Sequence, residues 1–407
     1  MNRFGLAVWW FLSTVAWASM PPSIPHLEME MTSEQYRALL GDRQNYADSN
    51  LSPVIDAGKR MLDWVNFLNE GRPPETIISL TSEATQIAYP INTPGLNSEK
   101  IVLHKFQALK TSLPAWMQKA LFENGALLKE LPVSDAEFIQ LGAVVNRIYQ
   151  SASRWQLQEP HLFQYETQKA RDIRGFYYLG HDQKLDLKWE KWNELAADQQ
   201  KQILVWLREM CENGTASNCS KKIDTVSTDG KKLSALYQSF KKSSQATWDS
   251  YFKLEDARSD VSWSEANLMR IPFTTPDRPA IEAFLKKEIQ DEWRWQDWQL
   301  QLDFGPGGSN TTHIEFVPGS TPHVNSLGGS TITMDANSPL NDYNVRWTIR
   351  HEFGHVLGFP DCYVEFYDRD LGAMVNYQID TSNLMCSRRG KFKQTHFDEL
   401  KAAYFKE

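Results

Sequence analysis

Residues 351–361 read His-Glu-Phe-Gly-His-Val-Leu-Gly-Phe-Pro-Asp, and most of what the sequence predicts starts from this stretch. A helix is expected over residues 345–357. Because residues four apart lie on one face of a helix, His351 and His355 can chelate one metal ion. Glu352 lies one step round the helix, beside the open side of that ion, where it can take a proton from a metal-activated water.

The third ligand is expected shortly after a glycine. Gly358 can adopt the left-handed backbone conformation that ends a helix and turns the chain sharply. This turn can bring Asp361 back toward the two histidines. Two imidazoles, one carboxylate and an open coordination position are the ligand set of a catalytic zinc ion. Four other side chains could supply the third ligand but lack the argument from the glycine turn: Glu365, Asp368, Asp370 and His396.

The motif resembles the long zinc motif of the metzincin metallopeptidases, in the H-E-x-x-H-x-x-G-x-x-D variant of the small secreted bacterial snapalysins. The resemblance covers residues 262–407 only. It implies a twisted sheet, an active-site helix and a methionine-containing turn, the Met-turn, beneath the zinc. Met385, within the tight turn Asn383–Ser387, is the preferred Met-turn residue, and Met374 is the alternative.

The resemblance also implies a strand beside the cleft. Metzincins place an antiparallel edge strand just before the zinc helix, and an exposed edge can pair with the backbone of an extended substrate. The residues of this sequence that occupy that place are Ser330, Thr331, Ile332, Thr333 and Met334.

The sequence departs from the family pattern at two positions. Asp361 stands where most metzincins have His, so the net charge of the metal site is one unit lower. Ser387 stands two residues after Met385, where some metzincins have a Tyr that assists at the oxyanion. Three tyrosines nearby could take that role: Tyr363, Tyr367 and Tyr377. In another class of zinc peptidases the third ligand is a Glu on a later helix, which makes Glu399 an alternative to Asp361.

The chain has four cysteines, which allow three disulfide connectivities. Proximity favours the pairs Cys211–Cys219 and Cys362–Cys386, and four buried free thiols are the alternative. Cys362 directly follows the expected third ligand, and Cys386 directly follows Met385. A bond between them would therefore hold the ligand loop against the Met-turn.

The N-terminus predicts export. Residues 1–18 combine a short basic start, an apolar run and an Ala-Trp-Ala cleavage site, which together match a secretory signal peptide. No later stretch approaches the ~18 consecutive apolar residues of a membrane span. The net charge of −8 gives no basic footprint for nucleic acid. We therefore expect a secreted or periplasmic protein, with no nucleic-acid partner and no membrane span after signal cleavage.

Three regions are expected after the signal. Residues 19–210 read as a mainly helical N-terminal domain, residues 211–261 as a polar linker region with a helix, and residues 262–407 as the zinc domain. The zinc domain is expected to start with a helix from Pro279 to Trp295. Three strands of alternating polarity follow: Trp298–Phe304, Thr312–Val317 and Ser330–Asp335. The aromatic run Gly175–Leu179 is interpreted as a strand or a buried turn. The expected fold class is α+β.

These features favour an exported zinc endopeptidase that uses one Zn²⁺ ion, with Glu352 as general base and a peptide or protein as substrate. One alternative is a zinc hydrolase that acts on cell-wall peptides or amides. The other is a non-catalytic secreted binding protein with a zinc-stabilised fold. The helical N-terminal region could be a propeptide, a substrate-recruiting module or a partner-binding domain.

Overall fold

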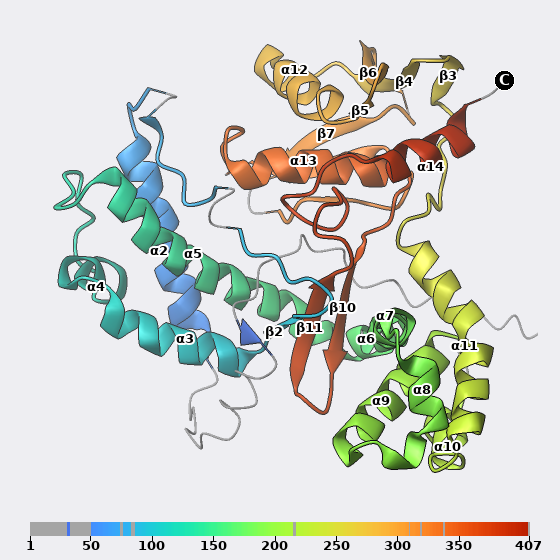
Figure 1. Ribbon diagram of the computed structural model, residues 1–407. Coiled ribbons are helices and arrows are strands. Elements are labelled where there is room, and N and C mark those ends of the chain that lie inside the picture. Colours follow the sequence, from blue (N-terminus) through green and yellow to red (C-terminus); the bar gives the residue numbers. More distant parts are fainter. Residues whose placement is uncertain are drawn as a thin grey trace, which may run out of the picture.

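The computed structural model describes residues 31–32, 50–73, 76–82, 86–214, 217–308, 310–317, 320–336 and 338–405. The expected signal peptide, residues 1–18, lies outside them. The described chain combines helices with several small sheets, in agreement with the expected α+β class, and residues 50–250 are mainly helical (Figure 1). None of the described helices combines the length and the apolar character that crossing a membrane requires.

The first group of helices encloses one hydrophobic core. Its members are α2 (Ser52–Asn69), α3 (Glu99–Ser112), α4 (Ala115–Phe122) and α5 (Asp135–Gln158). α5 starts at Ser134, whose side chain accepts a hydrogen bond from the backbone N–H of Glu137. Acidic residues in its first turn complement the helix dipole. The apolar face of α5 packs against α2, so burial of this face holds the pair together.

A second group of helices follows. Its members are α7 (Arg174–His181), α8 (Leu185–Glu190), α9 (Ala197–Asn213), α10 (Cys219–Asp224) and α11 (Gly230–Ser250), and α6 (Leu162–Thr167) precedes them. They enclose a separate core that contains the Cys211–Cys219 disulfide. Segment 211–261 contains the helix expected within it, α11, and also α10, so more of it is helical than a linker region implies. Its apolar residues, such as Leu233 and Tyr237, face this core while its many polar residues face solvent.

The aromatic run Gly175–Leu179 lies in helix α7, not in a strand or a turn. Helix α7 packs closely against α9 at this point. A Cβ atom on Gly175 would lie 2.2 Å from the backbone oxygen of Trp206, so only glycine permits this approach. The tertiary contact therefore determines the local structure of a run whose aromatic residues favour strands.

The strands form three small sheets. Their bounds are β1 (Met31–Thr32), β2 (Gly95–Asn97), β3 (Ser262–Glu265), β4 (Leu268–Thr274), β5 (Arg294–Trp295), β6 (Trp298–Gly305), β7 (His313–Val317), β8 (His323–Val324), β9 (Thr331–Asp335), β10 (Tyr363–Asp368) and β11 (Ala373–Gln378). The strand orders are β3-β4-β6-β5, β7-β9-β8 and β1-β2-β11-β10. The three strands predicted from alternating polarity are confirmed as β6, β7 and β9.

The strand expected at the edge of the cleft lies in the middle of its sheet. β9 pairs in parallel with β7 on one side and antiparallel with β8 on the other, where His323 lies opposite Thr333. The prediction of an edge strand is therefore wrong for its residues Ser330, Thr331, Ile332, Thr333 and Met334. The chain returns after β7 and covers the free side of β9, so β8 is the outer strand on that side.

The helix expected from Pro279 to Trp295 is also shorter in the structure. Three elements replace it: α12 (Pro279–Leu285), a π-helical turn (Lys286–Gln290) and β5 (Arg294–Trp295). The π-helical turn buries Glu288, whose carboxylate pairs with Arg346 and Arg350 of α13 (Tyr343–Val356). Trp295 pairs with Trp298 in the sheet. The last helix, α14, spans Gln394–Tyr404.

The helical region and residues 262–407 are joined by backbone and buried polar contacts. β2 of the helical region pairs with β11 of the C-terminal region. Arg154 of α5 is 1% exposed, and its guanidinium lies 2.7 Å from the carboxylate of Glu365 on β10. The Tyr377 hydroxyl donates a hydrogen bond of 2.8 Å to Asp172. The two regions therefore share a sheet and an interior, in spite of their different secondary structure.

The buried pair of Arg154 and Glu365 generates a prediction for stability. Arg154→Met should lower the free energy of unfolding by about 3–5 kcal/mol, because it leaves the Glu365 carboxylate buried without its cation. Denaturant unfolding of the purified protein measures this change. The matched control is Arg369→Met, which breaks the exposed pair of Arg369 and Glu166 and should cost less than about 1 kcal/mol. Equal losses in both variants would contradict the structural role of the buried pair.

Candidate metal centre

Helix α13 carries the two histidines and is anchored at both ends. Asp342 caps its N-terminus by accepting a hydrogen bond of 2.8 Å from the backbone N–H of Asn344. The hydroxyls of Ser79 and Thr81 donate to the same carboxylate at 2.7 and 2.6 Å. The helix ends at Val356, within a residue of the predicted end, and most of its second half is buried. It is therefore a rigid support for a site.

Three side chains converge at the C-terminal end of α13. The Oδ1 atom of Asp361 lies 2.9 Å from Nε2 of His351 and 3.3 Å from Nε2 of His355. The two Nε2 atoms lie 3.1 Å apart. In the part of the chain that the structure describes, no other group of His, Cys, Asp or Glu side chains offers a comparable set of ligand atoms. The structure thus brings together the three ligands predicted from the sequence.

The turn at Gly358 brings Asp361 to the histidines. Gly358 has φ of +93°, the left-handed conformation expected from the sequence. A Cβ atom at this position would lie 2.3 Å from the backbone oxygen of Asp256, so both conformation and space require glycine. The backbone N–H of Phe359 donates to the oxygen of Gly354 at 3.0 Å and closes the turn.

Hydrogen bonds to backbone carbonyls orient both imidazoles. Nδ1 of His351 lies 3.3 Å from the oxygen of Leu384, and Nδ1 of His355 lies 2.8 Å from the oxygen of Phe359. Donation from Nδ1–H to these carbonyls leaves the lone pair on Nε2, which faces Asp361. Metal-binding histidines commonly have this arrangement, because it fixes the tautomer and the ring orientation.

Met385 lies against α13 at Gly354, which stands between His351 and His355 in the sequence. A Cβ atom on Gly354 would lie 2.3 Å from the sulfur of Met385, so the methionine side chain rests directly on the helix backbone. Met385 is buried. The alternative, Met374, is buried in the core of the first helical group instead. Of the two candidates, Met385 is therefore the one that lies against the helix of the two histidines.

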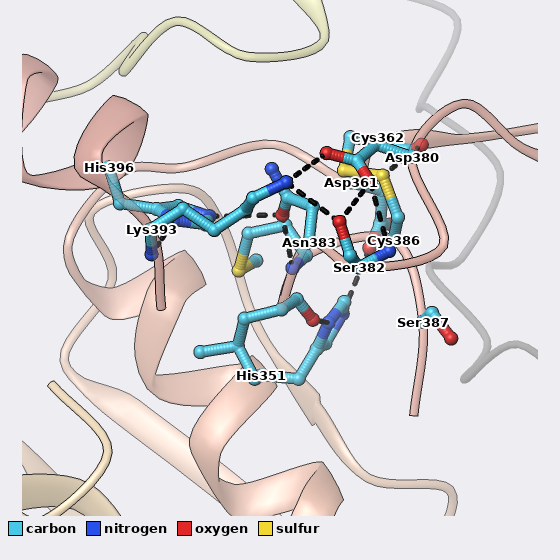
Figure 2. Close-up of a disulfide and its surroundings, with 12 residues drawn as sticks. His351, Asp361, Cys362, Asp380, Ser382, Asn383, Cys386, Ser387, Lys393 and His396 are labelled. Atoms are coloured by element: carbon cyan, nitrogen blue, oxygen red, sulfur yellow. Dashed lines mark hydrogen bonds and ion pairs between the residues drawn. A yellow bond between two sulfur atoms is a disulfide. The ribbon is translucent and has the colours of Figure 1, made fainter. Parts of the chain in front are cut away.

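A disulfide holds the ligand loop against the Met385 turn. Cys362 is bonded to Cys386, as the spacing of the cysteines predicted. The backbone N–H of Cys362 also donates to the oxygen of Met385 at 3.1 Å. Figure 2 shows the disulfide beside Asp361, with His351 on the helix below. The disulfide is thus one residue from a candidate ligand on one side and one residue from Met385 on the other.

Glu352 is buried beside the three ligands and lacks a partner for one oxygen. Only 3% of the residue is exposed, and Oε2 accepts no hydrogen bond from the described residues. Burial raises the pKa of this carboxyl above its usual value, although the nearby histidines partly oppose the shift. A buried carboxylate with a raised pKa and one oxygen that accepts no hydrogen bond has the properties required of a general base.

The charges of the three converging side chains depend on one another. Burial alone would lower the pKa of His355, but the Asp361 carboxylate outweighs this effect and raises the pKa to about 9. Burial alone would raise the pKa of Asp361, but the two histidines hold it well below its usual value. Without a metal ion the site therefore holds a proton between these groups at neutral pH, in the place where a cation would lie.

The other ligands considered from the sequence have different roles. Glu365 pairs with Arg154, and Asp368 pairs with Lys169 at 3.0 Å. Asp370 lies in the exposed turn between β10 and β11. The remaining two contact other parts of the fold: the His396 ring contacts Asn383, and the Glu399 carboxylate accepts a hydrogen bond from the backbone of Leu254. None of them belongs to the three-ligand group.

The three tyrosines differ in their access to the site. Tyr363 lines the cavity beside Asp361, and its ring centroid lies 6.5 Å from that of His351. Tyr377 is buried and its hydroxyl contacts Asp172, so it faces away from the ligands. Tyr367 packs against the core of the first helical group. Ser387 accepts a hydrogen bond from the Trp347 indole with its backbone oxygen and is buried. Tyr363 alone among these side chains faces the cavity.

A cavity of about 950 Å³ opens onto the candidate ligands and contains residues that the sequence did not identify. His355 and Asp361 line it, as does His323 of β8, whose Nδ1 lies 2.8 Å from the oxygen of Thr321. His323 carries no motif, and in sequence it resembles any surface histidine. The far wall comes from the helical region, a long-range contact that no local pattern could predict.

Comparisons of the chain with models of known protein families, with curated proteins and with solved structures find no match. The chemistry of the site is therefore argued from its own donor atoms. Two neutral imidazoles and one carboxylate suit zinc, and a nearby buried carboxylate suits proton transfer to and from a ligand. Of these side chains, His355 and Asp361 line the cavity.

The pKa values generate a prediction for metal binding. At pH 7 the metal-free site keeps a proton on His355, and zinc must displace it. We expect release of about one proton per zinc ion at pH 7, and an apparent zinc affinity that falls about 10-fold for each pH unit below the pKa. Calorimetric titration in buffers with different enthalpies of ionisation measures the released protons.

The matched control for this prediction is Asp361→Asn. It removes the carboxylate that raises the pKa of His355, so fewer protons should be released. It also removes a charged ligand, so the zinc affinity should fall at least about 10-fold. Equal proton release and equal affinity in the wild type and this variant would exclude Asp361 from the metal site.

The disulfide generates a second prediction. Cys386→Ser should weaken zinc binding about 10–100-fold and lower the melting temperature, because the loop that carries Asp361 is no longer tied to the Met385 turn. Cys219→Ser is the control: it breaks the disulfide in the helical region and should lower the melting temperature without changing zinc affinity. Unchanged zinc affinity in Cys386→Ser would show that the ligand loop does not depend on the disulfide.

Proposed function

We propose that this protein is an exported zinc endopeptidase. The observation that carries the proposal is the convergence of two imidazole Nε2 atoms and a carboxylate oxygen beside the unpartnered, buried Glu352. A purely structural metal site has no need of a general base, and its ligands are usually closed off from solvent. Here two of the candidate ligands, His355 and Asp361, line a cavity instead.

The protein groups have distinct tasks in the proposed reaction. His351, His355 and Asp361 would hold the ion, which would supply Lewis-acid polarisation of the substrate carbonyl and of the attacking water. Glu352 takes a proton from the attacking water as the new carbon–oxygen bond forms. It then transfers the proton to the amine nitrogen as the carbon–nitrogen bond breaks. Burial suits Glu352 for both steps, because a raised pKa allows it to hold the proton between them.

Asp361 affects the strength of this chemistry. A carboxylate in place of a third imidazole lowers the net charge of the loaded site by one unit, so the ion is a weaker Lewis acid. The pairing of Asp361 with both histidines supports its assignment as the third ligand. The compensating feature is the enclosed position of the ligands: His351 and His355 are at most 5% exposed, which strengthens local electrostatic interactions.

The proposed family relationship is to the metzincins, in the snapalysin-like variant. Three features support it: the left-handed Gly358, the position of Met385 against Gly354, and a strand before α13. The cleft edge differs from the family pattern, because β8 covers β9. Since β8 lines the cavity through His323 and Val324, we propose that an extended substrate meets β8 rather than β9.

Export is part of the proposal. The two disulfides are compatible with an oxidising compartment, and the N-terminal sequence has the pattern of a signal peptide. A peptidase that acts outside the cytoplasm would meet unfolded or flexible polypeptides as substrates. A secreted or periplasmic location is therefore consistent with the chemistry proposed for the site.

The central test replaces the proposed general base. Glu352→Gln should abolish hydrolysis of a casein-type substrate, because the glutamine amide cannot take up the proton of the attacking water. The zinc content should stay at about one ion per chain, because Glu352 is not one of the three proposed ligands. Metal analysis and a fluorescent-casein assay on the zinc-loaded protein measure both quantities.

Glu399→Gln is the matched control for this test. It makes the same change on α14, where the carboxylate accepts a hydrogen bond from the Leu254 backbone, and it should retain both zinc and activity. Substantial turnover by Glu352→Gln would sink the proposed mechanism. Loss of zinc in Glu399→Gln would instead favour Glu399 as a ligand. If the protein hydrolyses peptidoglycan but not casein, its substrates are cell-wall peptides or amides rather than proteins.

A further inference from the structure

The cavity beside the metal centre has two walls that come from distant parts of the chain. His355 and Asp361 lie on one wall with β8. The facing wall is formed by two segments of the helical region. One runs from the end of α5 to Arg171, and the other lies at the end of α11. The lining residues of this wall are Leu157, His161, Tyr165, Gln168, Arg171 and Tyr251. A substrate that reaches the metal centre therefore enters a space that the helical region helps to form.

The facing wall is held in place by buried contacts. Arg154, one turn before Leu157 on α5, pairs with Glu365, and Glu365 itself lines the cavity. The α6 helix contacts β10, which starts two residues after Asp361 (Figure 1). A shared sheet and a buried ion pair thus hold the helical region in place beside the cavity.

The cavity that His355 and Asp361 line also has apolar side chains on both walls. Leu157 is 47% exposed in spite of its apolar side chain. Val324 and Leu327 line the same cavity from the other wall and are only partly buried. Partly exposed apolar side chains in a concave surface are typical of a site that buries an apolar group of a ligand.

We propose that the helical region is the substrate-recognition wall of the cleft, and that it binds an apolar side chain of a polypeptide near the bond to be cleaved. This inference rests on the proposed peptidase function, and it goes beyond it by naming the substrate class and the residues that select it. Leu157 contacts the apolar side chain of the substrate, while Glu352 and the three ligands act on the peptide bond.

The test uses two leucines with nearly the same exposure. Leu157→Asp places a charge in the cavity, and Leu187→Asp places the same charge on α8, outside the cavity, where Leu187 is 48% exposed. Both substitutions are made in zinc-loaded Glu352→Gln protein, which is expected not to cleave the probe. The probes are two fluorescein-labelled peptides that are identical except for a central Leu or Ser. Fluorescence anisotropy measures their dissociation constants.

We expect the Leu peptide to bind about 10-fold more tightly than the Ser peptide, because an apolar pocket discriminates by about this factor. Leu157→Asp should remove the preference, and Leu187→Asp should keep it. Melting temperatures show whether both variants fold. If Leu157→Asp keeps the preference, or if no peptide binds, the inference is overturned. If the peptides bind with the expected preference but wild-type protein cleaves neither, the proposed peptidase activity is wrong. The inference that Leu157 selects an apolar side chain of a bound polypeptide is then still supported.

Discussion

The reversal of the chain at Gly358 is the constraint on which the site depends. The helix must end there, turn within three residues and return an acidic side chain to the histidines that it has just presented. The turn is possible only because the residue lacks a Cβ: Asp256 packs against it with its backbone oxygen. The Gly358 oxygen in turn accepts a hydrogen bond from the backbone N–H of Glu255. One residue thus shapes the candidate site and attaches it to the segment that leads out of the helical region.

The part of the site that depends on local geometry could be predicted from the sequence. Helical spacing places His351 and His355 on one face, a glycine marks the turn, and the adjacent cysteines indicate the tie between ligand loop and Met385. The first two inferences need only residues within a few turns of the chain, while the disulfide joins residues 24 apart in sequence. The packing of Met385 on Gly354 is a second longer contact, and its prediction depended on a resemblance rather than on spacing.

The rest depends on contacts between distant segments. Alternating polarity identified β9 but could not reveal that β8 pairs with its outer side, because two residues of strand carry no pattern. The helix expected up to Trp295 ends early because Glu288 is held by arginines of α13, far along the chain. The aromatic run around Gly175 became a helix through its contact with α9. Such long-range contacts decide local structure wherever propensity is weak.

The disulfide between Cys362 and Cys386 makes the geometry of the proposed site depend on the redox conditions around the protein. Reducing conditions in a cytoplasm oppose formation of this bond, and oxidising conditions outside it favour the bond. Under reducing conditions the chain would therefore carry Asp361 on a loop without its covalent tether. In the exported peptidase that we propose, the tether would close after the chain has left the cytoplasm, so the site would be completed away from the proteins of the producing cell.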